Sequence, residues 1–209
     1  MNNDIFMKIP KDIIYETDDL SSFRTLLLSY LYFKRDFNSQ ITTSIALICQ
    51  ELNLTFGRST SSGSQILALI KSLIADSTLI LEPRLTTLTP DQITRSSLFT
   101  VTYNPPYQNL TANYTILNLS EMNQLQNYLM SNSISIRTDK LLRLFLLIKS
   151  NINTKKSATT FFISNTSMRS LLRLGHANVQ EALDILEDAE LITSPEPQHY
   201  TLVKFTKNS

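Results

Sequence analysis

Residues 166–192, TSMRSLLRLGHANVQEALDILEDAELI, decide the fold of the second half of the chain. The hydroxyl residues Thr166 and Ser167 are typical of a helix start, and a short apolar helix is expected to follow them. After Gly175, apolar residues recur at i, i+3, i+4 and i+7, the spacing of an amphipathic helix with one buried stripe: Val179, Ala182, Leu183 and Leu186. The stretch therefore predicts two helices joined by a short turn.

The same pattern occurs in the first half of the chain, 113 positions earlier when Ile66 is aligned with Val179. The equivalent stripe consists of Ile66, Leu69, Ile70 and Leu73, and a shorter helix through Ile48 and Cys49 is expected to start near Thr43 and Ser44. Each half also has an earlier apolar stripe. These stripes are Phe23, Leu26, Leu27 and Tyr30 in the first half, and Leu141, Leu144, Phe145 and Ile148 in the second. The sequence therefore predicts three helices in each half.

A β-hairpin is expected after the third helix of each half. The apolar pairs Leu79-Ile80 and Leu191-Ile192 precede prolines, and a returning β-rich stretch follows at residues 97–103 and 200–205. The first connection is longer and contains Thr89-Pro90-Asp91, a helix start with proline at the first position. Short strands are also expected at 6–9 and 115–119, each leading into a helix.

The chain has 209 residues, which suits two small domains. Residues 105–113 contain two consecutive prolines with polar neighbours and are expected to form a linker between a first domain, 1–104, and a second, 114–209. Three helices followed by a hairpin make a winged helix-turn-helix. The predicted fold is mainly α with small β-hairpin wings (α+β), as two tandem winged helix-turn-helix domains.

The composition argues against an enzyme and against a cofactor. Only three glycines occur, too far apart for a phosphate-binding loop, and one cysteine with two histidines is too few for a cysteine-rich zinc site. Cys49 lies on an apolar stripe and is expected in the core. With no signal-peptide pattern and no apolar run long enough to cross a membrane, we expect a cytoplasmic protein without a membrane partner.

The sequence resembles the winged-helix replication initiator proteins of bacterial plasmids and phages. The resemblance lies in FMKIPKD at residues 6–12 with the helix at 23–33, in residues 43–54 with 64–81, and in LLRLG at 171–175 with the helix at 178–192. It implies winged-helix units that bind double-stranded origin DNA. One departure is that such proteins usually have a basic third helix, whereas Glu181, Asp184, Glu187, Asp188 and Glu190 make this helix acidic in the second half.

Charge supports a DNA-binding face in the second half, because lysine and arginine neutralise phosphates. Residues 120–180 contain eight basic and two acidic side chains, whereas residues 181–209 contain two basic and six acidic ones. Helix-turn-helix units meet the major groove at the turn before the third helix. The expected DNA-binding residues of this half are Arg169, Arg173, His176, Asn178 and Gln180, with Lys155, Lys156, His199 and Lys204 as further basic or wing contacts.

In the first half, the corresponding turn is rich in hydroxyl side chains that can bond phosphates or bases. The expected contacts there are Arg58, Ser61, Ser64, Gln65 and Lys71, with Gln65 and Lys71 best placed for the groove. A polar loop that only caps the next helix is the alternative interpretation of this segment.

Three functions are consistent with these patterns. The first is a sequence-specific duplex-DNA-binding protein that initiates replication of a plasmid or phage. The second is a transcriptional repressor, which the sequence does not separate from an initiator. The third is a winged-helix adaptor, for which the acidic third helix of the second half would contact a protein partner or a second copy in a homodimer.

Overall fold

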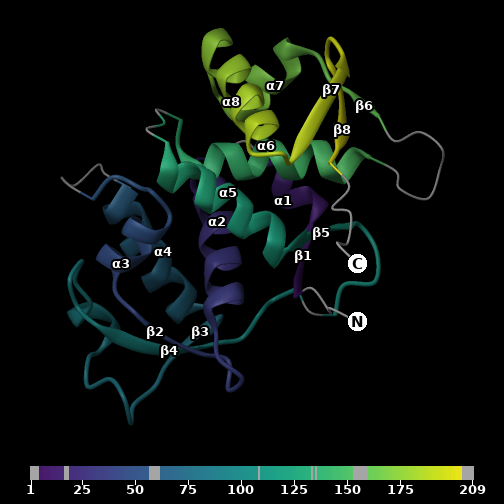
Figure 1. Ribbon diagram of the computed structural model, residues 1–209. Helices are drawn as coiled ribbons and strands as arrows, with labels where there is room; N and C mark the ends of the chain where they lie inside the picture. Colours follow the sequence, from purple (N-terminus) through teal and green to yellow (C-terminus); the bar gives the residue numbers. More distant parts are fainter. Residues whose placement is uncertain are drawn as a thin grey trace, which may run out of the picture. The chain divides into compact units, whose positions relative to one another are not determined.

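The computed structural model describes residues 5–16, 19–56, 62–107, 109–132, 134, 136–152 and 160–203, without the side chains of residues 19–21. These residues form eight α-helices, one 3-10 helix and three small antiparallel sheets (Figure 1). The mixed helix and sheet composition agrees with the α+β expectation. The chain divides into an N-half unit, Asp19–Asn109, and a C-half unit, Met1–Asp18 with Leu110–Ser209.

The N-half unit follows the order helix, strand, helix, helix and hairpin. Its elements are α2 (Asp19–Lys34), β2 (Gln40–Thr43), α3 (Ile45–Glu51), α4 (Ser62–Ala75), β3 (Leu79–Leu81), the 3-10 helix η1 (Pro90–Gln92) and β4 (Phe99–Tyr103). The sheet order is β2-β4-β3, so the last strand lies in the middle. Ile41 pairs with Val101, and Leu79 pairs with Tyr103.

The apolar stripes predicted for the N-half unit are buried in its core. Ile66, Ile70 and Leu73 of α4 are at most 1% exposed, as are Phe23 of α2 and Cys49 of α3. Burying one such side chain contributes about 1.5–3 kcal/mol, so these stripes account for the packing of the three helices. The predicted helix start before α3 is also confirmed, because the Ser44 side chain accepts a hydrogen bond from the Leu47 N–H at 3.2 Å.

The C-half unit repeats this order after a leading strand and helix. Its elements are β1 (Phe6–Pro10), α1 (Lys11–Tyr15), β5 (Tyr114–Asn118), α5 (Leu119–Ser131), α6 (Thr138–Asn151), β6 (Phe161–Phe162), α7 (Asn165–Leu172), α8 (His176–Asp188), β7 (Ile192–Glu196) and β8 (His199–Leu202). From α6 onward the order is again helix, strand, helix, helix and hairpin, and the sheet order β6-β8-β7 again has the last strand in the middle. Val179, Ala182, Leu183 and Leu186 are buried as predicted.

The first described residues belong to the C-half unit, not to a first domain of residues 1–104. β1 pairs antiparallel with β5, from Phe6 opposite Asn118 to Pro10 opposite Tyr114. The Lys11 ammonium donates to the Ser150 carbonyl of α6 at 2.5 Å. The Arg143 guanidinium of α6 donates to the Ile14 carbonyl at 2.9 Å. These bonds and the buried Ile14 hold the N-terminal segment to α6.

Three local features differ from the sequence expectation. The strands β2 and β6 were not expected, because β2 (QITT) contains a single apolar residue and β6 has only two residues, so neither shows a period-2 pattern. The helix α7 begins earlier than Thr166, since its cap is Ser164, which accepts a hydrogen bond from the Ser167 N–H at 3.2 Å. Within the described chain, no helix combines the length and apolar character that crossing a membrane requires.

Candidate nucleic-acid interface

The connection between α7 and α8 is a tight three-residue turn. Arg173 ends α7 in the left-handed backbone region, with φ 52° and ψ 45°, and its N–H donates to the Arg169 carbonyl. Gly175 is the cap residue of α8, and the Val179 N–H donates to its carbonyl at 3.1 Å. Nothing lies within 4 Å of the position that a Cβ would take at Gly175. The first turn of α8 is therefore accessible on this side.

Most of the residues expected to contact DNA in the second half are brought together around this turn. Arg169, Arg173, His176, Asn178 and Gln180 are all exposed, while Met168, Leu172 and Val179 between them are buried. The side chains of Arg169, His176 and Asn178 have no hydrogen-bond or ion-pair partner among the residues that the structure describes. The surface thus presents the two arginines, the His176 ring and the Asn178 amide beside the N-terminus of α8, where backbone dipoles favour negative charge.

Gln180 and the C-terminal end of α8 are already hydrogen-bonded within the C-half unit. The Gln180 amide donates to Asp184 Oδ1 at 2.8 Å. At the C-terminus, Tyr128 of α5 donates from its hydroxyl to Asp188 at 3.0 Å, and Gln124 donates to the Ala189 carbonyl at 2.7 Å. The C-terminal end of α8 is thus bonded to α5 at Asp188 and Ala189, whereas Asp184 lies one turn after Gln180 on the same helix face.

His199 lies in the hairpin of the C-half unit, next to its turn. His199 starts β8, its ring centre lies 5.1 Å from that of Phe162 in β6, and its Nδ1 is 3.0 Å from the Pro197 carbonyl oxygen. The distance from His199 Nδ1 to Glu196 Oε2 is 4.0 Å. Residues 192–202 contain no lysine or arginine. His199 directly follows the turn 197–198 and is the one basic side chain among residues 192–202, and its contact with DNA stays a prediction.

Four of the six lysine and arginine side chains that the structure describes within residues 120–180 are buried or half-buried. Lys140 and Arg143 of the buried helix α6 are 5% and 3% exposed. Lys149 is paired with Glu121 of α5, and both side chains are largely buried. Arg137 makes two hydrogen bonds to Asp139, at 2.8 and 2.9 Å. Of the described cations in this range, only Arg169 and Arg173 are exposed.

In the N-half unit, residues of the β3–β4 connection cover part of α4. Ser64 is bonded to the Arg95 guanidinium, and the Lys71 ammonium is 3.4 Å from the Asp91 carbonyl. Gln65 is half-buried. Ser64 and Lys71 were expected to face DNA, whereas their polar groups face residues 91–95. The expected helix start at Pro90 is confirmed as η1, with the Thr89 N–H donating to Gln92 at 2.8 Å.

Arg95 is the residue that sequence reasoning missed in this region. Its carbonyl accepts from the Ala46 N–H of α3 at 3.0 Å, its guanidinium donates to Ser64 of α4, and its Cζ lies 5.8 Å from the ring centre of Phe56. Burial raises the pKa of the Cys49 thiol to about 11, and the Arg95 charge partly offsets this rise. No spacing signal connects residue 95 to residue 64, so only the folded chain reveals the contact.

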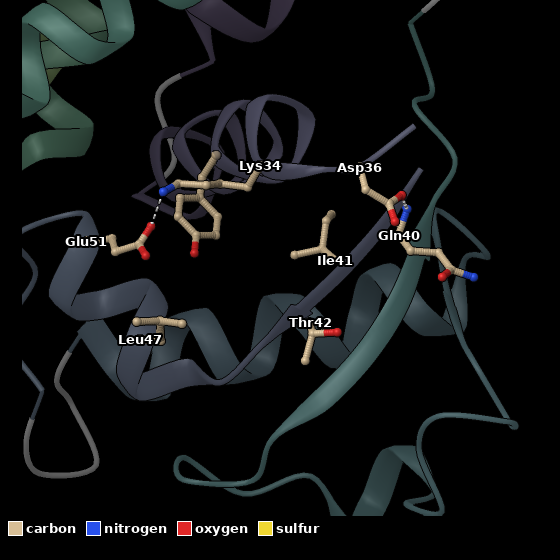
Figure 2. Close-up of a pocket in the computed structure, with 8 residues that line it drawn as sticks. Lys34, Asp36, Gln40, Ile41, Thr42, Leu47 and Glu51 are labelled. Carbon is tan, nitrogen blue, oxygen red and sulfur yellow. Dashed lines mark hydrogen bonds and ion pairs between the residues drawn. The ribbon is translucent and has the colours of Figure 1, made fainter. Parts of the chain in front are cut away.

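A hollow of about 340 Å³ opens between the end of α2, β2 and α3 (Figure 2). Lys34 pairs with Glu51 at 2.7 Å across it, and the Thr42 hydroxyl lies 2.9 Å from that of Thr100. Burial raises the pKa of Tyr30 to about 12, with Thr43 lowering it and Glu51 adding to the rise. Asp36 accepts hydrogen bonds from the Asn38 and Gln40 N–H groups at 2.8 Å, so the charged side chains of the lining are paired with one another or with the backbone.

Five of the expected DNA-binding residues, Arg58, Ser61, Lys155, Lys156 and Lys204, lie outside the described residues. Within the described part of the chain, no group of three or more His, Cys, Asp or Glu side chains is placed to hold a metal ion. A comparison with models of known protein families finds no match, and a comparison with curated proteins finds none either.

Proposed function

We propose that this protein is a tandem winged-helix protein that binds double-stranded DNA through α7, α8 and the turn between them. In both units a helix, a strand, two helices and a hairpin follow in order, and the last strand lies in the middle of the sheet. That arrangement is the one expected of a winged helix-turn-helix. The repetition of the same sheet order in two units supports the tandem assignment.

One observation carries the DNA-binding proposal: Arg169, Arg173, His176 and Asn178 are exposed together around the start of α8. Arginines on either side of the turn can neutralise phosphates, and the free backbone N–H groups of the first helical turn add a favourable dipole. An asparagine in this turn can pair with an adenine edge in the major groove. Asp188 and Ala189 at the C-terminal end of α8 are bonded to α5, about three turns from the residues that would contact phosphates.

Selection from a random duplex pool tests this proposal. The full chain is incubated with the pool at low salt, and bound sequences are recovered over several rounds and read. Enrichment of one motif, with affinity that falls as salt is raised, is the expected result. Failure to bind duplex at low ionic strength, where electrostatic attraction is strongest, would rule the proposal out.

For the biological role, we propose replication initiation in a plasmid or phage, acting from the cytoplasm. The resemblance to winged-helix initiators supports this role over the alternative of a transcriptional repressor. The selected motif distinguishes the two: repeated copies at an origin fit an initiator, whereas a site overlapping a promoter fits a repressor. A homodimer would place two α8 helices on successive turns of the duplex, about 34 Å apart.

A winged-helix adaptor is the second candidate function, because acidic side chains are exposed on and directly after α8. Asp184, Asp188 and Glu190 are exposed at the far end of α8 and offer an acidic surface to a protein. An adaptor would not select a DNA motif, and its partner would be lost when these carboxylates are replaced by amides. The pool selection therefore separates this candidate from the DNA-binding proposal.

A further inference from the structure

The two helix pairs of the repeat differ at equivalent positions. With the 113-residue offset, Ser64 and Gln65 of α4 correspond to Ala177 and Asn178 of α8. Ala177 and Asn178 are exposed, whereas Ser64 and Gln65 are half-buried. The same two positions of the repeat are therefore open in one unit and partly covered in the other.

The cover over α4 comes from its own β3–β4 connection. η1 contacts α4, and Ile93 at its end is 1% exposed, so this part of the connection packs against the unit. Arg95 then joins three segments through its carbonyl bond to Ala46, its guanidinium bond to Ser64 and its position over the Phe56 ring. The C-half unit has only the turn Pro197–Gln198 at this point, which is too short to reach its α8 in the same way.

A covered first turn has a direct consequence for DNA reading. Base edges in the major groove are contacted by side chains near the N-terminus of the inserted helix, so this turn has to approach the groove floor closely. Arg95 lies against that part of α4 through its bond to Ser64, while Asp91 of η1 lies beside Lys71, about two turns further along the helix. At α8, the corresponding side chains have no such neighbour among the residues that the structure describes.

We propose that base recognition by this protein is confined to α8, and that α4 is a structural helix whose first turn is held by Arg95. This inference rests on the proposed DNA-binding function and specifies which half of the repeat reads sequence. Arg95 is a positioning residue for α3 and α4, and Asn178 determines specificity. A site selected by one chain should then contain one kind of half-site, and a dimer should select two copies of it.

The test compares amide-to-alanine changes at the two equivalent positions, Asn178→Ala and Gln65→Ala, in the full chain. Base preferences of the wild type and both variants are determined by selection from the same random duplex pool. We expect Asn178→Ala to reduce discrimination at one base pair by roughly 5- to 150-fold, the range for losing a good bidentate contact. Gln65→Ala should leave the selected motif unchanged and alter affinity by less than about twofold.

Each other outcome is decisive as well. A changed base preference in Gln65→Ala, or an unchanged one in Asn178→Ala, overturns the inference while leaving DNA binding intact. If the wild type selects no motif, the proposed function itself fails, and the inference fails with it. Thermal unfolding of both variants serves as the folding control, and because Gln65 lies on a helix where alanine is favourable, this variant is expected to fold.

Discussion

At the scale of single residues, burial decides which chemical groups are available. The sequence contains one thiol, at Cys49, and its basic residues include Lys140 and Arg143, but the structure buries all three side chains. Asn178 and Arg169, by contrast, are exposed at the turn. The sequence predicted the buried Cys49 because the residue lies on an apolar stripe. It did not predict the buried cations, since a count of charges along the chain contains no information on what folds over them.

The raised pKa of Tyr30 predicts a loss of stability in alkali. The pKa of this hydroxyl is about 12 in the folded chain, above the ordinary value near 10, mainly because the group is buried. Below pH 10 the Tyr30 hydroxyl keeps its proton in both the folded and the unfolded chain, so its contribution to the free energy of unfolding is fully present. Between pH 10 and 12 the unfolded chain ionises first, and this residue lowers the free energy of unfolding by up to about 1.4 kcal/mol per pH unit.

Urea unfolding of the wild type and Tyr30→Phe at pH 8 and pH 11 checks this prediction. The variant should have a lower free energy of unfolding than the wild type at pH 8, because it lacks the hydrogen bonds of the Tyr30 hydroxyl. The difference between the two proteins should be smaller at pH 11, because only the wild type loses stability through Tyr30. Tyr103, whose pKa burial also raises, remains in both proteins and serves as the internal reference. If the free energy of unfolding fell by the same amount in both proteins between pH 8 and pH 11, the loss of stability in alkali would not come from Tyr30.

At the scale of elements, periodicity predicted the helices well and short strands poorly. The four-residue stripes of α4 and α8 define a buried face over two turns, and the structure buries all eight residues. β6 has only two residues and depends on pairing with β8, in which Phe161 lies opposite Tyr200. β1 and β5 were expected as separate strands, but their pairing joins residues more than 100 positions apart. No local pattern specifies such a register.

Replacing Leu183 by alanine should destabilise the C-half unit by about 2–5 kcal/mol, the range for a buried leucine that leaves a cavity. Leu183 is 2% exposed and lies in the buried stripe of α8. Chemical denaturation followed by circular dichroism measures the change. Asp184→Ala, one position along on the exposed side, is the matched control and should shift stability by less than about 0.5 kcal/mol. Equal effects at both positions would mean that the buried face of α8 is misassigned.

At the scale of the whole molecule, the repeat is discontinuous. The first eighteen residues belong with residues 110–209, so the N-half unit is inserted between two parts of the C-half unit. The sequence predicted two units with a proline-containing linker at residues 105–113, and the structure divides the chain after Asn109, within that range. The sequence analysis assigned the N-terminal strand to the first domain, because a strand directly before a helix is usually part of the same domain as that helix. In the structure this strand, β1, pairs with β5 of the C-half unit.

Removing residues 1–16 should therefore destabilise the C-half unit and spare the N-half unit. The deletion takes away the buried side chains of Met7, Ile9 and Ile14, each contributing about 1.5–3 kcal/mol, and the carbonyl that binds Arg143. Hydrogen exchange should speed up at Leu117 in β5 and stay slow at Ile70 in α4. Fast exchange at Ile70 with protection kept at Leu117 would instead support a first domain of residues 1–104.

The most direct test of the central claim, that the α7–α8 turn binds duplex DNA, is the salt dependence of affinity in the double variant Arg169→Ala, Arg173→Ala. Both arginines are exposed, and each is expected to release counterions from one phosphate. We predict weaker binding and a slope of log affinity against log salt that is shallower by about two, with unchanged thermal stability. A slope identical to that of the wild type would contradict the claim, because it would place these arginines outside the DNA interface.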